Sequence, residues 1–93
     1  MVATPDSMFK RRDGVVSQVA SKKMVLLDVD GGEYYSLNDV GARVWELSDG
    51  SHSLEQIINT IIEEHDAPGD VIRGDVTELV EDLVVEKLLV KVS

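Results

Sequence analysis

The sequence of 93 residues contains no cysteine. This absence excludes disulfides, thiolate-bound metals and a cysteine nucleophile. There is also no apolar run of the roughly 18 to 20 residues that a membrane span needs. The basic residues at 10–12 are not followed by an apolar segment, so a secretory signal is not expected. We therefore expect a cytoplasmic protein without a membrane partner.

Basic residues are scarce. Nine lysines and arginines stand against eighteen aspartates and glutamates, which gives a formal net charge of -9. Nucleic-acid binding takes much of its affinity from clustered Lys and Arg side chains. The composition therefore disfavours DNA and RNA as partners and fits a neutral or basic partner.

The chain offers little that resembles a catalytic or metal site. His52 and His65 are its only histidines, and neither has a second ligand at metal spacing. Each stands beside an expected helix boundary, where a histidine usually has a structural role. The pair Gly31-Gly32 is not followed directly by a helix, so it is not a phosphate-binding loop. We expect no metal, no cofactor and no enzymatic activity.

Length and the presence of only two prolines indicate one domain. Residues 1–12 combine Pro5 with small polar residues and show no apolar periodicity, so we expect a flexible N-terminal tail. Residues 13–93 are then the domain.

The first half of this domain predicts three antiparallel strands, over residues 15–20, 24–29 and 33–37. Asp30-Gly31 predicts a two-residue hairpin turn with positive φ at both positions. Alternation in the third strand places Tyr35 and Leu37 on one face and Tyr34 and Ser36 on the other. One tyrosine is therefore expected in the core, and the other partly exposed or lining a groove; the pattern leaves open which is which.

The second half predicts three helices. Asn38 is expected to cap the first, over residues 39–47, which carries Trp45 into the core. Ser53 and Gln56 form a capping box for the second, and residues 67–69 close it. The third helix covers residues 70–87, and residues 88–92 form a short strand or an extended tail. Three strands followed by three helices resemble a winged helix-turn-helix, a fold of the α+β class.

The third predicted helix is acidic, with six acids against Arg73 and Lys87. Its apolar stripe is broad, and acids form one rim while Arg73, Thr77, Val80 and Val84 form the other. Such a stripe either belongs wholly to the core or also lines a groove, and the periodicity leaves both open. The local charge would repel DNA phosphates.

Several segments together resemble one family. They are Leu26-Leu27-Asp28, residues 32–38, residues 41–45, Asp49-Gly50, and Asp75-Val76 followed by Leu79, Leu83 and Leu88. In this order they resemble the PqqD-like proteins, or RiPP recognition elements, over residues 15–92. These are small winged-helix domains that bind leader peptides of ribosomally made, modified natural products.

Within that family the chain is most similar to the stand-alone proteins of lasso-peptide biosynthesis. Proteins of the PQQ pathway carry a His-Gly pair before the second strand and a Gly-Trp pair after the last helix. Here Lys87-Leu88-Leu89 stands at that end. The PQQ pathway, or another RiPP pathway, is therefore the second interpretation.

The resemblance implies a non-catalytic adaptor. The leader peptide of a lasso precursor would pair antiparallel with the third strand and place side chains against the third helix. A separate cysteine protease and a cyclase would then act on the precursor. The peptide-binding residues implied in this way are Glu33, Tyr34, Tyr35, Ser36, Leu37, Arg73, Asp75, Val76, Leu79, Val80, Asp82 and Leu83.

Among these residues, Val76, Leu79, Val80 and Leu83 would form an apolar floor. Asp75 and Asp82 would pair with basic leader residues. A winged-helix transcription regulator is the alternative from a different functional class.

Overall fold

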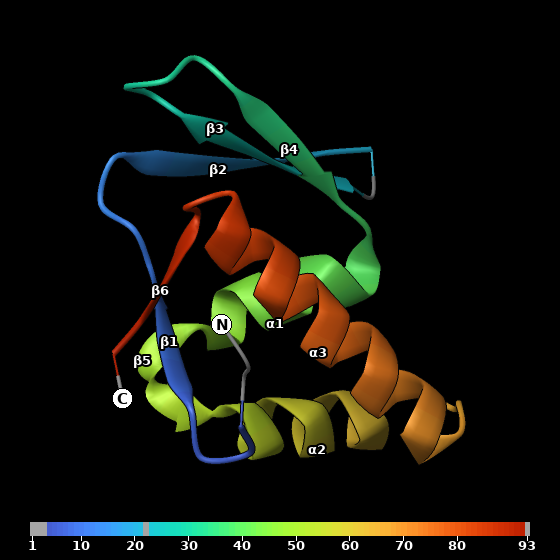
Figure 1. The fold of residues 1–93 in the computed structure, drawn as a ribbon. Coiled ribbons are helices and arrows are strands. Elements are labelled where there is room, and N and C mark those ends of the chain that lie inside the picture. Colours follow the sequence, from blue (N-terminus) through green and yellow to red (C-terminus); the bar gives the residue numbers. More distant parts are fainter. Residues whose placement is uncertain (1–3, 22, 93) are drawn as a thin grey trace.

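Two separate antiparallel sheets and three helices make up the fold (Figure 1). It was obtained as a computed structural model that describes residues 4–21 and 23–92. In chain order the elements are β1 (Met8–Arg11), β2 (Val15–Ala20), β3 (Lys23–Asp28), β4 (Tyr34–Leu37), α1 (Asp39–Leu47), β5 (Asp49–Ser53), α2 (Leu54–Glu64), α3 (Gly69–Val85) and β6 (Leu89–Lys91). The α+β class is confirmed.

The first sheet has the order β2-β3-β4 and contains the three predicted strands. β2 coincides with its prediction, and β3 and β4 are each shifted or shortened by one residue. β2 pairs with β3 over its whole length, and β3 pairs with β4 from Met24–Leu37 to Leu27–Tyr34. β4 is thus an edge strand.

The turn between β3 and β4 differs from its prediction. The amide of Asp28 donates to the carbonyl of Glu33 and the amide of Gly32 to the carbonyl of Asp28, both at 2.8 Å. These bonds enclose a four-residue loop, in which only Gly32 has a positive φ, 72°. The prediction of a two-residue turn at Asp30-Gly31 is therefore wrong. The side chain of Asp28 accepts hydrogen bonds from the amides of Asp30 and Gly31 and so organises the longer loop.

The second sheet has the order β5-β1-β6 and corrects the predicted N-terminal tail. The prediction of a flexible segment over residues 1–12 is wrong for residues 8–11, because these form the central strand, and Phe9 is fully buried. Residues 1–3 lie outside the described residues. With one core side chain in four residues, β1 has no periodicity of its own, and it depends on distant partners.

The strand β5 also alters the predicted order of elements. Its sequence Asp-Gly-Ser-His-Ser lacks any apolar residue, so no strand was expected between the first two helices. For residues 88–92 a short strand and an extended tail were both open, and β6 shows that the strand forms. One three-stranded sheet followed by three helices is therefore wrong as a description of the whole chain. The winged helix-turn-helix label stays a prediction.

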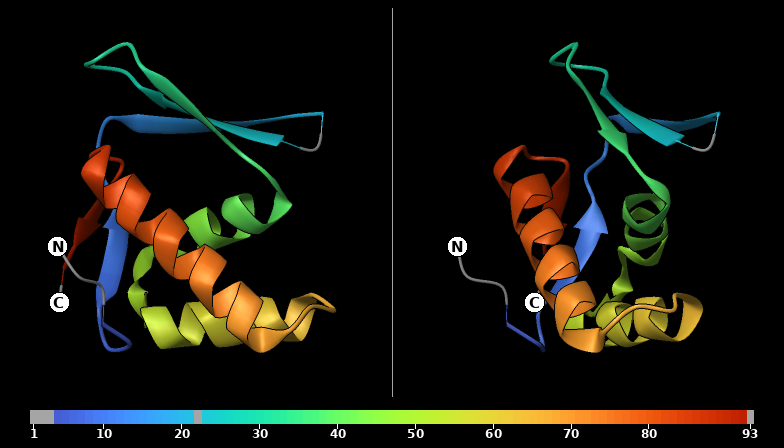
Figure 2. Two further views of the ribbon diagram at one scale, coloured as in Figure 1. Left: turned by 45° about the vertical axis from the view of Figure 1, so that its right-hand side comes forward. Right: turned by 90° about the vertical axis from the view of Figure 1, so that its right-hand side faces the viewer.

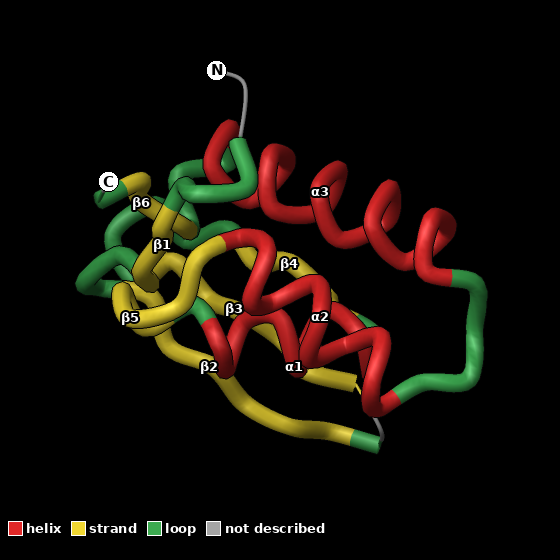
Figure 3. The backbone as a smooth tube through the Cα atoms, turned by 90° about the horizontal axis from the view of Figure 1, so that it is seen from below, coloured by secondary structure: helices red, strands yellow, loops and turns green. Residues whose placement is uncertain are grey.

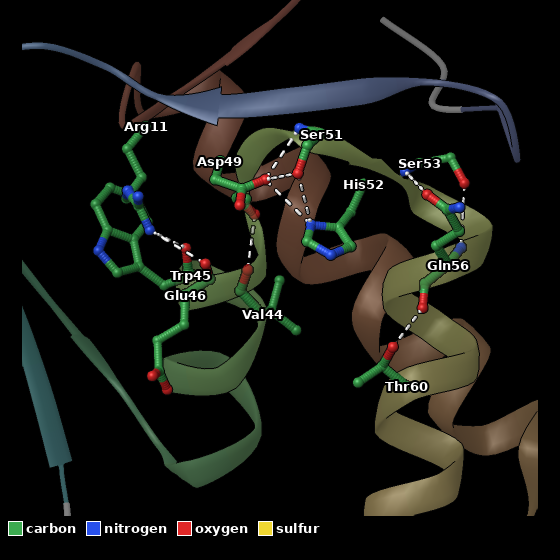
Figure 4. Close-up of polar contacts among 11 residues, drawn as sticks. Arg11, Val44, Trp45, Glu46, Asp49, Ser51, His52, Ser53, Gln56 and Thr60 are labelled. Carbon is green, nitrogen blue, oxygen red and sulfur yellow. Dashed lines mark hydrogen bonds and ion pairs between the residues drawn. The ribbon is translucent and has the colours of Figure 1, made fainter.

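The helix starts follow their predicted caps. The side chain of Asn38 accepts from the amide of Gly41 at 2.9 Å, and Ser53 and Gln56 form both bonds of the capping box. Figure 4 shows this box beside the polar contacts of β5, where Asp49 binds Ser51 and the imidazole of His52. The histidine therefore has a structural role, as expected.

The core lies between the inner face of the β2-β3-β4 sheet, the three helices and β1. Its members include residues of every layer: Phe9, Met24, Leu26, Leu37, Val44, Trp45, Leu54, Ile57, Ile58, Ile61, Val76, Val80, Leu83 and Leu89. Figure 2 shows the β2-β3-β4 sheet on one side of the helices, with α2 farthest from it, and in the view from below in Figure 3 α1 and α2 overlap this sheet. The predicted core role of Trp45 is confirmed, and Met24 is buried as well.

Burial of Phe9 makes β1 an integral part of the domain, which a substitution can test. We expect Phe9→Ala to lower the free energy of unfolding by about 3–5 kcal/mol, because a fully buried ring leaves a cavity. Denaturant unfolding followed by circular dichroism measures this loss. Lys10→Ala, at the exposed neighbouring position, is the matched control; equal stability of the two variants would contradict the packing described.

Candidate functional site

The free edge of β4 presents backbone groups in a fixed alternation. In an antiparallel pair, residues alternate between bonding the partner strand and pointing away from it. The bond from Asp28 to Glu33 sets the phase, so Tyr35 and Leu37 bond β3. The N–H and C=O groups of Tyr34 and Ser36 consequently point to the open edge.

The side chains of β4 alternate as predicted. Leu37 is buried and Tyr35 is half-buried against the core, whereas Ser36 and Glu33 are exposed. Tyr34 is 76% exposed. Tyr35 is thus the core-facing tyrosine, and Tyr34 lies on the outer face of the sheet.

Two hollows lie on the side of the sheet that faces α3. Each has β4 or the start of α1 on one side, and α3 or the residues just after it on the other. The larger, of about 210 Å³, lies just after β4 and is lined by Asn38, Val40, Gly41, Asp75 and Leu79. The smaller, of about 20 Å³, lies at the start of β4 and is lined by Asp28, Glu33, Tyr34, Tyr35, Glu86 and Leu88. α3 passes below the sheet in Figures 1 and 2. We call the region between the two hollows the β4–α3 groove.

The larger hollow depends on a close approach of α1 to β4. A Cβ atom at Gly41 would lie 3.1 Å from Cβ and Cδ2 of Leu37. Glycine therefore lets the first turn of α1 lie against the end of β4.

The helical wall of the groove is acidic. Asp75, Leu79, Asp82 and Glu86 follow the i, i+4, i+7, i+11 spacing of one helix face. The three acids are exposed, Leu79 is half-buried, and Glu33 adds a carboxylate on the strand side. The groove combines an apolar patch with negative charge.

The other residues predicted on α3 do not reach this groove. Val76, Val80 and Leu83 have no exposed surface and belong to the core. Packing in the core therefore explains the breadth of the apolar stripe. Of the four residues predicted to form an apolar floor, only Leu79 lines a described hollow.

Arg73 lies on a different side of α3. Its guanidinium binds the carboxylate of Glu55 on α2, with Nη1 2.7 Å from Oε2. This contact raises the pKa of Arg73 and lowers that of Glu55. The structure therefore gives Arg73 a partner within the fold, away from β4.

Arg12 connects the strand side of the groove to the helix side. Its Nη2 lies 2.9 Å from Oδ2 of Asp28, at the base of the hairpin. Its Nε donates to the carbonyl of Lys87, and its amide donates to the carbonyl of Leu88 at 3.0 Å. Arg12 thus holds the hairpin beside the end of α3. Its role was missed because residues 1–12 were expected to be a tail.

Other lining residues were also missed. Val40 lines the larger hollow and Glu86 the smaller one, and neither is among the predicted binding residues. The signal for Glu86 was its helical spacing from Asp75 and Asp82, which places all three on one face. For Asn38 the sequence indicated a cap, and no local pattern indicates that a cap also lines a hollow.

Two other kinds of functional feature are absent from residues 4–21 and 23–92. These residues contain no group of three or more His, Asp or Glu side chains placed to hold a metal ion. Their helices also include none that is long and apolar enough to cross a membrane.

Comparison with protein families identifies the chain. The model of coenzyme PQQ synthesis protein D (PqqD) matches residues 23–89, from β3 to β6. The chain belongs to the PqqD family. It is a PqqD-like RiPP recognition element, as the resemblance in its sequence implied. No curated protein matches the chain.

Several solved structures are similar to this recognition element. TbiB1 in complex with the TbiA(beta) leader peptide is 30% identical, with a TM-score of 0.75 over 86% of this chain and 93% of that one. A lasso peptide synthetase B1 complexed with its leader peptide is 26% identical, with a TM-score of 0.77 over 88% and 96%. The heterocyclase TruD, at 16% identity and a TM-score of 0.63, shares the fold over 12% of its own length.

The contact of Arg12 with the hairpin of the recognition element predicts a pH dependence. The hydrogen bond from Arg12 lowers the pKa of Asp28 below its ordinary value of 3.8. The resulting stability is complete above that value and is lost as the pH falls through the lowered pKa. We expect Arg12→Gln to unfold at a lower temperature than the wild type at pH 6, and the gap to shrink as the pH falls below about 4.

Thermal unfolding at several pH values, followed by circular dichroism, measures this gap. Lys10→Gln removes a neighbouring charge for which the structure gives no ion pair with a described residue, and serves as the control. A gap between wild type and Arg12→Gln that stays constant from neutral to acid pH would contradict the assigned contact.

Proposed function

We propose that this chain is a non-catalytic adaptor that binds the leader peptide of a lasso precursor by strand addition to β4. The observation that carries the proposal is the free edge of β4 at Tyr34 and Ser36, with α3 on the facing side. Main-chain hydrogen bonds to these two residues supply affinity that tolerates sequence variation. The relatives solved with leader peptides support the same role.

The geometry favours different side chains at the two ends of the bound peptide. A peptide antiparallel to β4 places alternate side chains toward α3. Those opposite Leu37 lie near the hollow of Val40 and Leu79, which favours an apolar side chain. Those opposite Glu33 lie near Glu86, at the acidic end of the groove.

The bound leader then places the precursor before its processing enzymes. We infer a separate cysteine protease that removes the leader and a cyclase that closes the ring. In this proposal the adaptor itself contributes affinity and position.

Two alternatives lead to different experiments. A PQQ-pathway or other RiPP precursor would bind the same groove with a different leader, so parallel titrations with several synthetic leaders separate the pathways. A transcription regulator would have to present the α3 face of Asp75, Asp82 and Glu86 to phosphates, which that charge opposes.

Removal of an outward amide of β4 tests strand addition directly. We expect Ser36→Pro and Tyr34→Pro each to weaken leader binding by about fivefold or more, because proline cannot donate the edge hydrogen bond. Fluorescence anisotropy of a labelled synthetic leader measures the dissociation constant, and thermal unfolding verifies the fold.

Ser17→Pro is the matched control for this experiment. It places proline at an outward amide of the opposite edge strand, β2, and is expected to leave leader affinity unchanged. Wild-type affinity in both folded β4 variants would show that the leader does not pair with this edge.

The acidic wall predicts a salt-dependent contribution to binding. We expect Asp82→Asn to weaken binding of a leader that carries basic residues about twofold to fivefold at low salt, because exposed charge pairs contribute little. Raising the ionic strength should reduce this difference. Glu78→Gln, an exposed change off this face, is the control; equal effects of both variants would argue against a specific contact at Asp82.

A further inference from the structure

β2 is a second edge strand, at the side of the sheet opposite β4. Its sequence Val-Val-Ser-Gln-Val-Ala contains no charge, proline or glycine. Its pairing with β3 runs from Val15–Asp28 to Ala20–Lys23 without a bulge. Natural edge strands usually carry charged residues, prolines or bulges, which prevent pairing with another chain. β2 has none of these three protective features.

The register shows which backbone groups of β2 are free. The amide of Val29 donates to the carbonyl of Gly14, and this bond sets the phase. Val16 and Gln18 therefore bond β3, while Val15, Ser17 and Val19 point their N–H and C=O groups outward. Across the described ranges, no other segment supplies a backbone hydrogen bond to these three residues.

The side chains of the same three residues lie on the inner side of the sheet. A hollow of about 480 Å³ lies there and is lined by Val15, Ser17, Met24 and Trp45 together with three basic and three acidic residues. Val19 lies two residues beyond Ser17 and is 70% exposed. An open hollow and a projecting valine thus lie on the same side of one strand.

We propose that a second copy of this chain pairs antiparallel with β2 about a twofold axis at Ser17. Of the registers that place outward groups opposite one another, this one pairs all three outward residues of each copy. Ser17 then stands opposite Ser17 of the second copy, and Val15 stands opposite Val19. Each Val19 covers Val15 at the edge of the other copy's hollow. Val16 stands opposite Gln18 on the outer face, so no charges are opposed within the paired strands.

This dimer leaves the proposed leader site free. Its sheet would have the order β4-β3-β2-β2-β3-β4, with both β4 edges at its ends. Each copy can therefore bind one leader, and the dimer two. The charge of -9 on each copy opposes association, so dimerisation should strengthen as salt screens that repulsion.

Sedimentation equilibrium tests the dimer in the absence of leader. We expect the weight-average mass to rise from 10.2 kDa towards twice that value as the concentration increases, and to rise further at higher salt. Val19→Lys, which adds a charge to the edge, should hold the mass at that of the monomer. Its melting temperature should match that of the wild type at a concentration at which both are monomers.

Val85→Lys makes the same change at an exposed valine of α3, 74% exposed, and should dimerise like the wild type. A wild-type mass that stays at 10.2 kDa up to about 1 mM would overturn the proposal, as would undiminished dimerisation of Val19→Lys.

A single introduced cysteine tests the register, because the chain has none of its own. Residues of a hydrogen-bonded antiparallel pair have Cα atoms about 5.5 Å apart, which a disulfide can span. Ser17→Cys should therefore form a covalent dimer on mild oxidation, and Val85→Cys should not. Equal cross-linking of the two would exclude the twofold axis at Ser17.

The two edges can be tested independently by crossed substitutions. Ser17→Pro should lose dimerisation and keep leader binding, whereas Ser36→Pro should keep dimerisation and lose leader binding. Loss of leader binding in Ser17→Pro, with its fold intact, would place the leader at β2 and overturn both assignments. Loss of dimerisation in Ser36→Pro alone would place the dimer interface at β4 and overturn this proposal.

Discussion

The register of β4 is the constraint on which the proposed site depends. A single phase of the antiparallel ladder decides two properties of each residue: the side-chain face and the backbone direction. Leu37 and Tyr35 must face the core, and this requirement turns their backbone groups toward β3. The backbone groups of Tyr34 and Ser36 are then left at the edge. The hydrophobic core therefore determines which hydrogen-bonding groups a peptide meets.

Contacts at both ends of β4 hold this edge in front of α3. At one end, the Asn38 cap and the close approach at Gly41 place the start of α1 against Leu37. At the other, Arg12 connects Asp28 to the carbonyl of Lys87 at the end of α3. A groove whose ends are both fixed by contacts within the chain loses little conformational entropy when a peptide binds. The extended peptide supplies most of the ordering cost.

Local sequence patterns predicted the strand and the helices that border this groove. The contacts that hold the ends of the groove join residues far apart in the sequence, and these were not predicted. The helix caps at Asn38 and Ser53 and the alternation of β4 are encoded in a few adjacent residues, and each was confirmed. β1 has one core side chain and β5 has no apolar residue, and both strands exist because β1 pairs with β5 on one side and with β6 on the other. For the same reason Arg12 was not recognised. Burial of Val76, Val80 and Leu83 depends on packing around the whole of α3, which helical periodicity alone leaves undecided.

The two edges of the β2-β3-β4 sheet differ in what surrounds them, and this difference favours different occupants. β4 faces an acidic helix wall, so charge as well as the backbone selects the peptide that pairs with it. β2 is uncharged along its length and has a hollow beside it in which three bases are balanced by three acids. An interface between identical, strongly acidic chains is stable only where neither surface presents its excess charge. Among the strands of this sheet, β2 meets that condition and β4 does not, so a second copy fits β2 and leaves β4 to a basic peptide.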